Sequence, residues 1–158
     1  MSCQQRGSKI QIKGESLKSE TVLAIGKFSI LWSEFEKKNL NNNCTPKKLI
    51  EEGEKHKTSD AWREFAKKIQ GRADYYEGLD IEFYVEYSLW PESAHRMQDE
   101  HMKLITEFIK SDGEESTSGG FLAIYRIRNN LLHGLKELEQ LDNQIELFNA
   151  MNNILETL

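Results

Sequence analysis

Proline, cysteine and long apolar runs are all scarce in this chain of 158 residues. The two prolines, Pro46 and Pro91, interrupt little of the chain, and the many Leu, Ile, Glu and Lys residues favour long helices over sheets. No apolar run approaches the roughly 18–20 residues that a membrane span needs. Residues 1–18 also lack the apolar segment of a signal peptide. We therefore expect a cytoplasmic protein with no membrane partner.

The cysteines and the net charge narrow the class of protein further. Cys3 and Cys44 are expected to be free thiols in a reducing compartment, and a disulfide between them is the alternative. The formal net charge of −5 argues against a protein that coats nucleic acid, because such proteins are usually basic. It does not argue against an enzyme that acts on nucleic acid at one local basic site.

Hydrophobic periodicity predicts an all-α protein, a helical bundle of about five helices in up-and-down order. We place a single domain at residues 19–158, after a flexible N-terminal tail at residues 1–18. Helices are expected at about 20–38 with Ser19 as the N-cap, from the Thr45-Pro46 cap onward, from Ser59 or Asp60 to about Gly71, at 93–110, at 121–133 and at about 136–156. Residues 111–120 form the clearest loop. Residues 75–90 fit a strand or a helix, and a helix is favoured because a lone strand would have no partner.

The helix expected at 121–133 carries the residues best suited to chemistry. Apolar side chains dominate its first half, and polar ones crowd its second half: Arg126, Arg128, Asn129, Asn130 and His133. Helical geometry places Arg126 and Asn129 on the face of His133, and Arg128 about 140° around the helix. Arginine offers a planar, permanently charged fork of donors to phosphate oxygens, and histidine titrates near neutrality and can act as an acid or a base. The segment therefore predicts a site that acts on a phosphate.

This stretch resembles the HEPN superfamily, the small helical domains of prokaryotic defence and toxin–antitoxin systems. The family signature is an arginine, a polar residue and then, after a short gap, a histidine, and Arg128, Asn129 and His133 match that form. Arg126 also lies within the permitted spacing, so the choice of arginine stays open, with Arg128 favoured. The first helix is similar to the family as well, with three residues spaced four apart: Phe28, Trp32 and Glu36.

The resemblance implies a HEPN-like bundle and a metal-independent endoribonuclease that needs no cofactor and serves as a toxin or in phage defence. A ribose 2′-OH would attack the adjacent phosphate of RNA, leaving 2′,3′-cyclic phosphate and 5′-OH ends. His133 would move protons, Arg128 would stabilise the phosphorane charge and Asn129 would orient, while Arg126 and Asn130 would bind the substrate.

Partners are implied by the same resemblance. HEPN domains are typically homodimers, which here would meet through the 121–133 helix, and an antitoxin protein would be a further partner. Some members are associated with a nucleotidyltransferase antitoxin and carry a tyrosine two residues after the histidine. This chain has Leu135 at that position, so modification of such a tyrosine is not expected.

Other interpretations follow from the residues alone. A histidine at a helix C-terminus can simply interact with the helix dipole, and the arginines can form salt bridges. The chain would then be a non-catalytic HEPN-like module that binds RNA, a nucleotide or a protein, or else a helical adaptor. Glu92 and His95 have the spacing of a di-iron carboxylate motif, but one copy is too few, so no metal site is expected. We expect Glu36, His56 and His101 to be solvated, and the three tryptophans to be buried: Trp32, Trp62 and Trp90.

Overall fold

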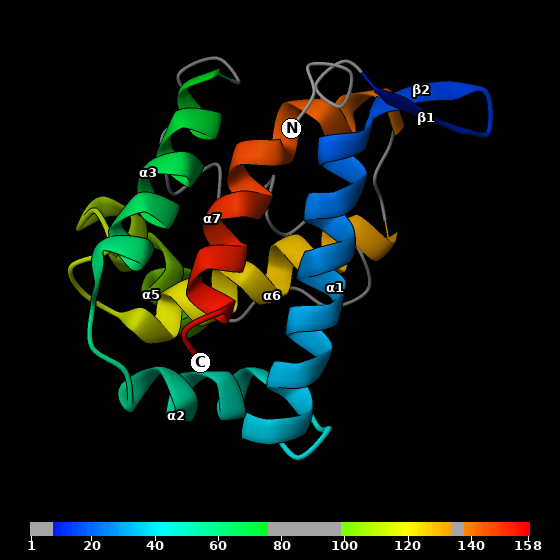
Figure 1. The fold of residues 1–158 in the computed structure, drawn as a ribbon. Coiled ribbons are helices and arrows are strands. Elements are labelled where there is room, and N and C mark those ends of the chain that lie inside the picture. The colour runs from blue at the N-terminus through cyan, green and yellow to red at the C-terminus, as the bar shows by residue number, and fades with distance from the viewer. Residues whose placement is uncertain (1–7, 76–98, 134–137) are drawn as a thin grey trace.

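The computed structural model describes residues 8–75, 99–133 and 138–158 (Figure 1). In order, the elements are β1 (Lys9–Ile12), β2 (Glu15–Lys18), α1 (Ser19–Asn39), α2 (Pro46–Glu54), α3 (Asp60–Tyr75), α5 (Asp99–Lys110), α6 (Thr117–His133), the 3₁₀-helix η3 (Leu138–Gln144) and α7 (Ile145–Leu155). The mainly helical character is confirmed. The ambiguous segment after Tyr75 and the start of the helix expected at 93–110 lie outside the described residues. No described helix has the length and apolar character needed to cross a membrane.

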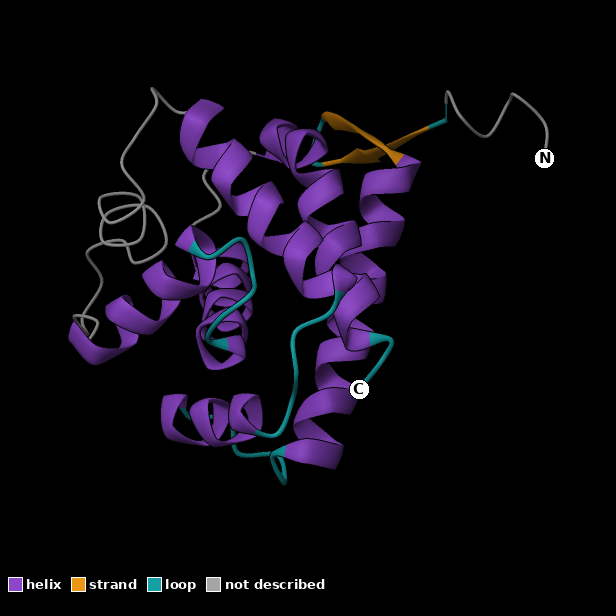
Figure 2. Ribbon diagram, turned by 90° about the vertical axis from the view of Figure 1, so that its left-hand side faces the viewer, coloured by secondary structure: helices purple, strands orange, loops and turns teal. Residues whose placement is uncertain are grey.

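The helices are not arranged in the predicted up-and-down order. α5 and α6 are consecutive and pack together, but α7 packs between α1 and α3, and α2 packs on α6 (Figure 1). In both views α2 lies across one end of the other helices (Figure 2). The physical reason is that α7 is buried at Leu147, Phe148, Met151 and Ile154, and only a position between two helices covers so wide an apolar surface.

Aromatic rings fill the core between these helices. Phe28 of α1 meets Phe148 of α7 edge to face at 5.3 Å, and Phe35 stacks on Phe121 of α6, also at 5.3 Å. Trp62 of α3 meets Phe121 at 4.9 Å. Trp32 and Trp62 are 2% and 3% exposed, which confirms the prediction that they are buried, whereas Trp90 lies outside the described residues. The core thus ties α6 to both α1 and α3.

A β-hairpin replaces most of the predicted flexible tail, so that prediction is wrong for residues 9–18. β1 and β2 pair antiparallel across a two-residue turn in which Lys13 and Gly14 both have positive φ, the geometry that hairpins favour. Leu17 is 1% exposed, and the Asp142 carboxylate accepts hydrogen bonds from the Lys18 backbone N–H (3.0 Å) and the Thr21 hydroxyl (2.5 Å). The buried Leu17 side chain and the hydrogen bonds to Asp142 hold the hairpin against the rest of the fold, next to η3.

Helix ends agree with the sequence in part. Thr45 caps α2 as predicted, its hydroxyl accepting from the Lys48 N–H, with Pro46 as the first helical residue. Ser19 is not the N-cap of α1, because Lys18 holds that position, and α3 continues past Gly71. The single helix expected at 136–156 is wrong for residues 138–144, which form a 3₁₀-helix before α7 begins.

The predicted loop at 111–120 is shorter than expected because α6 begins at Thr117. Gly119 and Gly120 therefore lie inside α6, where the lack of a side chain allows neighbouring elements to pack closely. A Cβ atom at Gly119 would clash with the Leu104 carbonyl of α5, and one at Gly53 of α2 would clash with the Ser118 backbone of α6. The three helices can approach this closely only where a side chain is missing.

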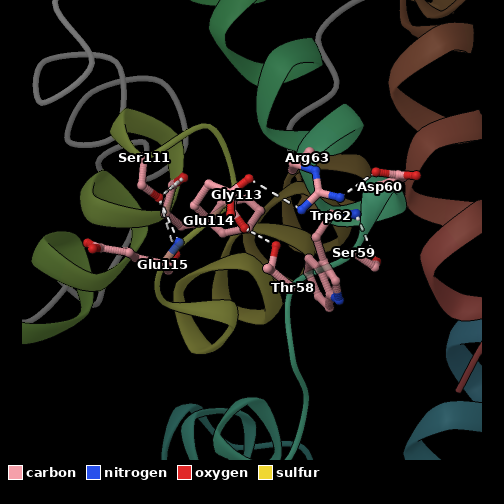
Figure 3. Close-up of polar contacts among 10 residues, drawn as sticks. Thr58, Ser59, Asp60, Trp62, Arg63, Ser111, Gly113, Glu114 and Glu115 are labelled. Atoms are coloured by element: carbon pink, nitrogen blue, oxygen red, sulfur yellow. Dashed lines mark hydrogen bonds and ion pairs between the residues drawn. The ribbon is translucent and has the colours of Figure 1, made fainter.

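The short connection before α6 is held against the start of α3 (Figure 3). The Thr58 hydroxyl donates to the Gly113 carbonyl, and Arg63 contacts Glu114 at 3.3 Å as well as Asp60. Gly113 has a positive φ, and a Cβ atom there would press on the Trp62–Arg63 backbone. These contacts fix the point at which α6 begins.

Candidate functional site

The first half of α6 is an internal helix. The Thr117 hydroxyl donates to the Gly53 carbonyl at 2.6 Å, and the Ser118 hydroxyl donates to the Ile50 carbonyl at 2.7 Å. Residues 121–124 are at most 3% exposed. The predicted homodimer interface along 121–133 is therefore wrong for residues 121–124, which the chain buries in its own core.

Arg128 of the predicted site is partly exposed to solvent and has two neighbours that the structure describes, Asn129 and Glu36. Its side chain is 35% exposed. One terminal nitrogen donates to the Asn129 side-chain oxygen at 3.2 Å, and the other lies 4.0 Å from a carboxylate oxygen of Glu36. The structure thus brings the predicted Arg128 and Asn129 together and adds an acidic partner from α1.

Glu36 is held in place rather than solvated as expected. Its side chain is 23% exposed, and the indole N–H of the buried Trp32 donates to the same carboxylate oxygen that faces Arg128. Trp32 and Glu36 are one helical turn apart, so this bond forms within α1. The buried indole orients the carboxylate, whose negative charge faces the Arg128 guanidinium at 4.0 Å.

Cys44 borders this cluster from the segment between α1 and α2. Its thiol is free and half-buried. Burial raises the pKa of Cys44 to about 12; the negative charge of Glu36 adds to the rise, and the positive charge of Arg128 opposes it. The thiol is therefore protonated at neutral pH and is a poor nucleophile. Cys3, the second cysteine, lies outside the described residues.

Arg126 differs from Arg128 in its surroundings. It is 7% exposed, and burial lowers the pKa of Arg126 to about 10, with a smaller opposing effect of Tyr125. The side chain is still a cation at neutral pH. The predicted role in binding substrate would need its covering residues to move, so the structure favours Arg128 as the accessible arginine.

The other two predicted site residues are known here only by position in the helix. Asn130 and His133 belong to α6, which ends at His133, and their side chains lie outside the described residues. Along an ideal helix, His133 follows Arg128 by about 7.5 Å of axial rise. The same spacing turns the helix by about 140°, so one phosphate meets both groups only when the Arg128 side chain extends around the helix.

A second polar cluster was missed by the sequence analysis. The Glu52 carboxylate, 5% exposed, accepts from Asn39 at 3.2 Å and lies 2.7 Å from the His56 ring nitrogen. The His56 ring also packs on Phe121 at 5.5 Å, so the expectation of a solvated histidine is wrong. Hydrogen bonds and nearby Lys55 outweigh burial and lower the pKa of Glu52. The four-residue spacing of Glu52 and His56 was the available signal.

Histidine, cysteine and carboxylate side chains do not form a metal-binding group anywhere in the described parts of the chain. His101 is half-buried on α5, and the Glu92–His95 pair lies outside the described residues. No protein-family model, curated protein or solved structure matches the chain. What the site can do is therefore argued from its own residues.

Proposed function

We propose that this protein is a metal-independent endoribonuclease of the HEPN type, in which α6 supplies the catalytic groups. The observation that carries the proposal is the Arg128 guanidinium, which is partly exposed, held between Asn129 and Glu36, and placed five residues before His133. Phosphodiester cleavage without a metal needs a positioned cation and a group that exchanges protons, and Arg128 and His133 are the residues of α6 proposed for these roles.

The proposed reaction uses the 2′-OH of RNA as the nucleophile. His133 accepts the hydroxyl proton while the 2′-oxygen forms a bond to phosphorus, and the bond from phosphorus to the 5′-oxygen breaks. The leaving 5′-oxygen takes up a proton from water and His133 then returns its proton to the solvent, which gives a 2′,3′-cyclic phosphate and a 5′-OH end. DNA is not a substrate because it has no 2′-OH.

Arg128 stabilises the charge that develops on the phosphoryl oxygens. A guanidinium has five N–H donors, and Asn129 takes one of them, so a parallel pair can still be offered to a phosphate. Glu36 sets the orientation of the fork and is displaced in part when the phosphate binds. Asn129 keeps the guanidinium on the helix, and Asn130 is proposed to add a substrate contact. Arg126 is only 7% exposed and would reach the substrate only if its covering residues moved.

The biological setting follows from the same proposal. An endoribonuclease of this kind would serve as a toxin or in phage defence, with an antitoxin protein as its inhibitor. Residues 121–124 of α6 are buried in the chain's own core and so are not available to a partner protein.

The test is cleavage of a mixed RNA pool in EDTA, with the ends of the products identified by mass spectrometry. We expect cleavage to persist in EDTA and to fall by about 10²–10⁴-fold in His133→Ala, because general acid–base catalysis contributes that much. His101→Ala, prepared identically, is the histidine control, and the residual cleavage by His133→Ala sets an upper limit on any contaminating nuclease. A requirement for a divalent metal, 5′-phosphate ends or cleavage of DNA would each contradict the mechanism.

A matched pair of arginine variants tests the role of the guanidinium. Arg128 and Arg63 have equally exposed side chains, 35% each, and both contact carboxylates. Replacement by lysine keeps the charge but removes the planar fork. We expect Arg128→Lys to lose most activity and Arg63→Lys to keep it. RNA binding without cleavage in the wild-type protein would instead support a non-catalytic RNA-binding module.

A further inference from the structure

The outer face of α1 carries the two most exposed large apolar side chains of the described residues. Leu23 is 71% exposed and Ile30 is 72% exposed. They lie seven residues apart, which is two helical turns, so they share one face. Gly26 and Ser33, both exposed, lie on the same face at intervals of three or four residues. We call this face, Leu23–Gly26–Ile30–Ser33 with Glu20 and Lys37 at its ends, the α1 stripe.

Nothing in the packing of the described residues explains the glycine at position 26. A Cβ atom added there would meet nothing within 4 Å, and its φ is not positive. A glycine inside a helix costs roughly 0.5–1 kcal/mol relative to alanine, so the chain carries a penalty that its own packing does not require. A glycine between two exposed apolar side chains leaves a hollow on the helix surface that can accept a large side chain of a second helix.

We propose that the α1 stripe is the contact between two copies of this chain, with the two α1 helices antiparallel. The stripe is complementary to itself in shape. With the two-fold axis at the level of Phe28, Leu23 faces Ser33 of the second copy and Ile30 faces Gly26 of the second copy. Each large side chain thus meets a small one, as knobs-into-holes packing requires.

The charges at the ends of the stripe favour the same orientation. Glu20 is exposed near the N-terminus of α1 and Lys37 is exposed near its C-terminus. Antiparallel helices bring Glu20 of one copy beside Lys37 of the other at both ends. Parallel helices would place like charges together and would set Gly26 against Gly26, leaving a gap.

The contact is small, so the dimer is expected to be weak and dependent on concentration. The stripe runs from Glu20 to Lys37, about 25 Å of helix, which is short for a permanent interface. This proposal does not rest on ribonuclease activity. It places the two Glu36–Arg128 clusters at opposite ends of the helix pair instead of across one cleft.

Sedimentation velocity of the full chain from about 1 to 300 μM tests the proposal without any RNA. We expect a monomer–dimer equilibrium in the micromolar range. Leu23→Glu and Ile30→Glu should each weaken it by at least about 30-fold, the size of a hot-spot loss, while the circular dichroism stays unchanged because both side chains are exposed. A monomer throughout this range would overturn the proposal, as would a dimer that neither variant weakens.

Two further sets of variants test the proposed dimer. A pair of glycine variants tests the close packing at Gly26, and a charge exchange tests the antiparallel orientation of the two α1 helices. Gly71 of α3 is also exposed and helical, and a Cβ atom there would likewise meet nothing within 4 Å. Gly26→Gln and Gly71→Gln should both raise the Tm, and only Gly26→Gln should abolish the dimer. Glu20→Lys and Lys37→Glu should each weaken the dimer a few-fold, and the double variant should restore it. Equal effects of the two glycine variants, or no rescue by the double variant, would overturn the antiparallel contact.

Discussion

Replacing each of the two arginines of α6 by alanine should affect different properties of the protein. Arg126 is 7% exposed, so Arg126→Ala leaves a cavity where the buried side chain was. We expect a loss of about 2–4 kcal/mol in the free energy of unfolding. For a chain of this size that is a fall in Tm of roughly 5–15 °C.

Arg128→Ala should cost far less stability and far more activity. The substitution removes a hydrogen bond to Asn129 at 3.2 Å and an ion pair with Glu36 at 4.0 Å, both at a partly exposed side chain. Such interactions contribute about 1 kcal/mol or less together, because solvent replaces them. Cleavage of RNA should nevertheless fall by about 10²-fold or more, since the charge that stabilises the transition state is gone.

The assay measures Tm and RNA cleavage for both variants at a temperature at which both remain folded. At that temperature Arg126→Ala should retain most of the wild-type activity. Arg126→Met, which refills most of the buried volume with an apolar chain, should recover part of the Tm and tests whether the loss is one of packing. An Arg126→Ala protein that is stable but inactive, beside a fully active Arg128→Ala protein, would refute the reasoning from burial.

Three further predictions concern stability and the thiol. Glu52→Gln should cost about 1 kcal/mol at pH 7, because a charge-assisted acceptor becomes a neutral one. Folding lowers the pKa of Glu52, so the ionised carboxylate stabilises the folded protein at pH values above the usual carboxyl pKa. This stabilisation is lost as the pH falls through the lowered pKa. Urea unfolding of both proteins should therefore converge at acidic pH. Glu36→Gln should lower the pKa of Cys44 from about 12, so that its reaction with a disulfide reagent begins at lower pH, and Arg128→Ala should do the opposite. Gly119→Ala should destabilise the protein by about 1–3 kcal/mol in thermal unfolding, because the added methyl clashes with the Leu104 carbonyl, despite a gain in helix propensity.

Helix positions could be predicted well where local signals determine them. The Thr45-Pro46 cap predicted the start of α2 because the cap and the proline act within a few residues. The start of α6 could not be predicted in this way. Gly119 and Gly120 are typical of a loop, and only the close approach of α5 shows that they belong to a helix. The hairpin was also missed, although Gly14 between short apolar segments was a usable signal.

Of the predicted site residues, the structure pairs Arg128 with Asn129, while the site as a whole stays a prediction. The surroundings of these residues could not be predicted from the sequence. The spacing of Arg126 and Arg128 gives no measure of burial, and the first is enclosed while the second is accessible. Glu36 lies 92 positions before Arg128, so no local pattern links the two side chains. Tertiary packing brings such distant residues together, so their contacts cannot be predicted from a single sequence.

The position of α7 between α1 and α3 has a consequence for how the protein is made. α7 lies later in the chain than both helices that it joins, and its rings close the core with partners such as Phe28, which is 120 positions earlier. A nascent chain that has emerged only as far as α6 therefore exposes the inner faces of α1 and α3 on the ribosome. Such an intermediate exposes apolar surface that chaperones bind, and the fold on which the proposed activity depends is complete only after residue 155 has emerged.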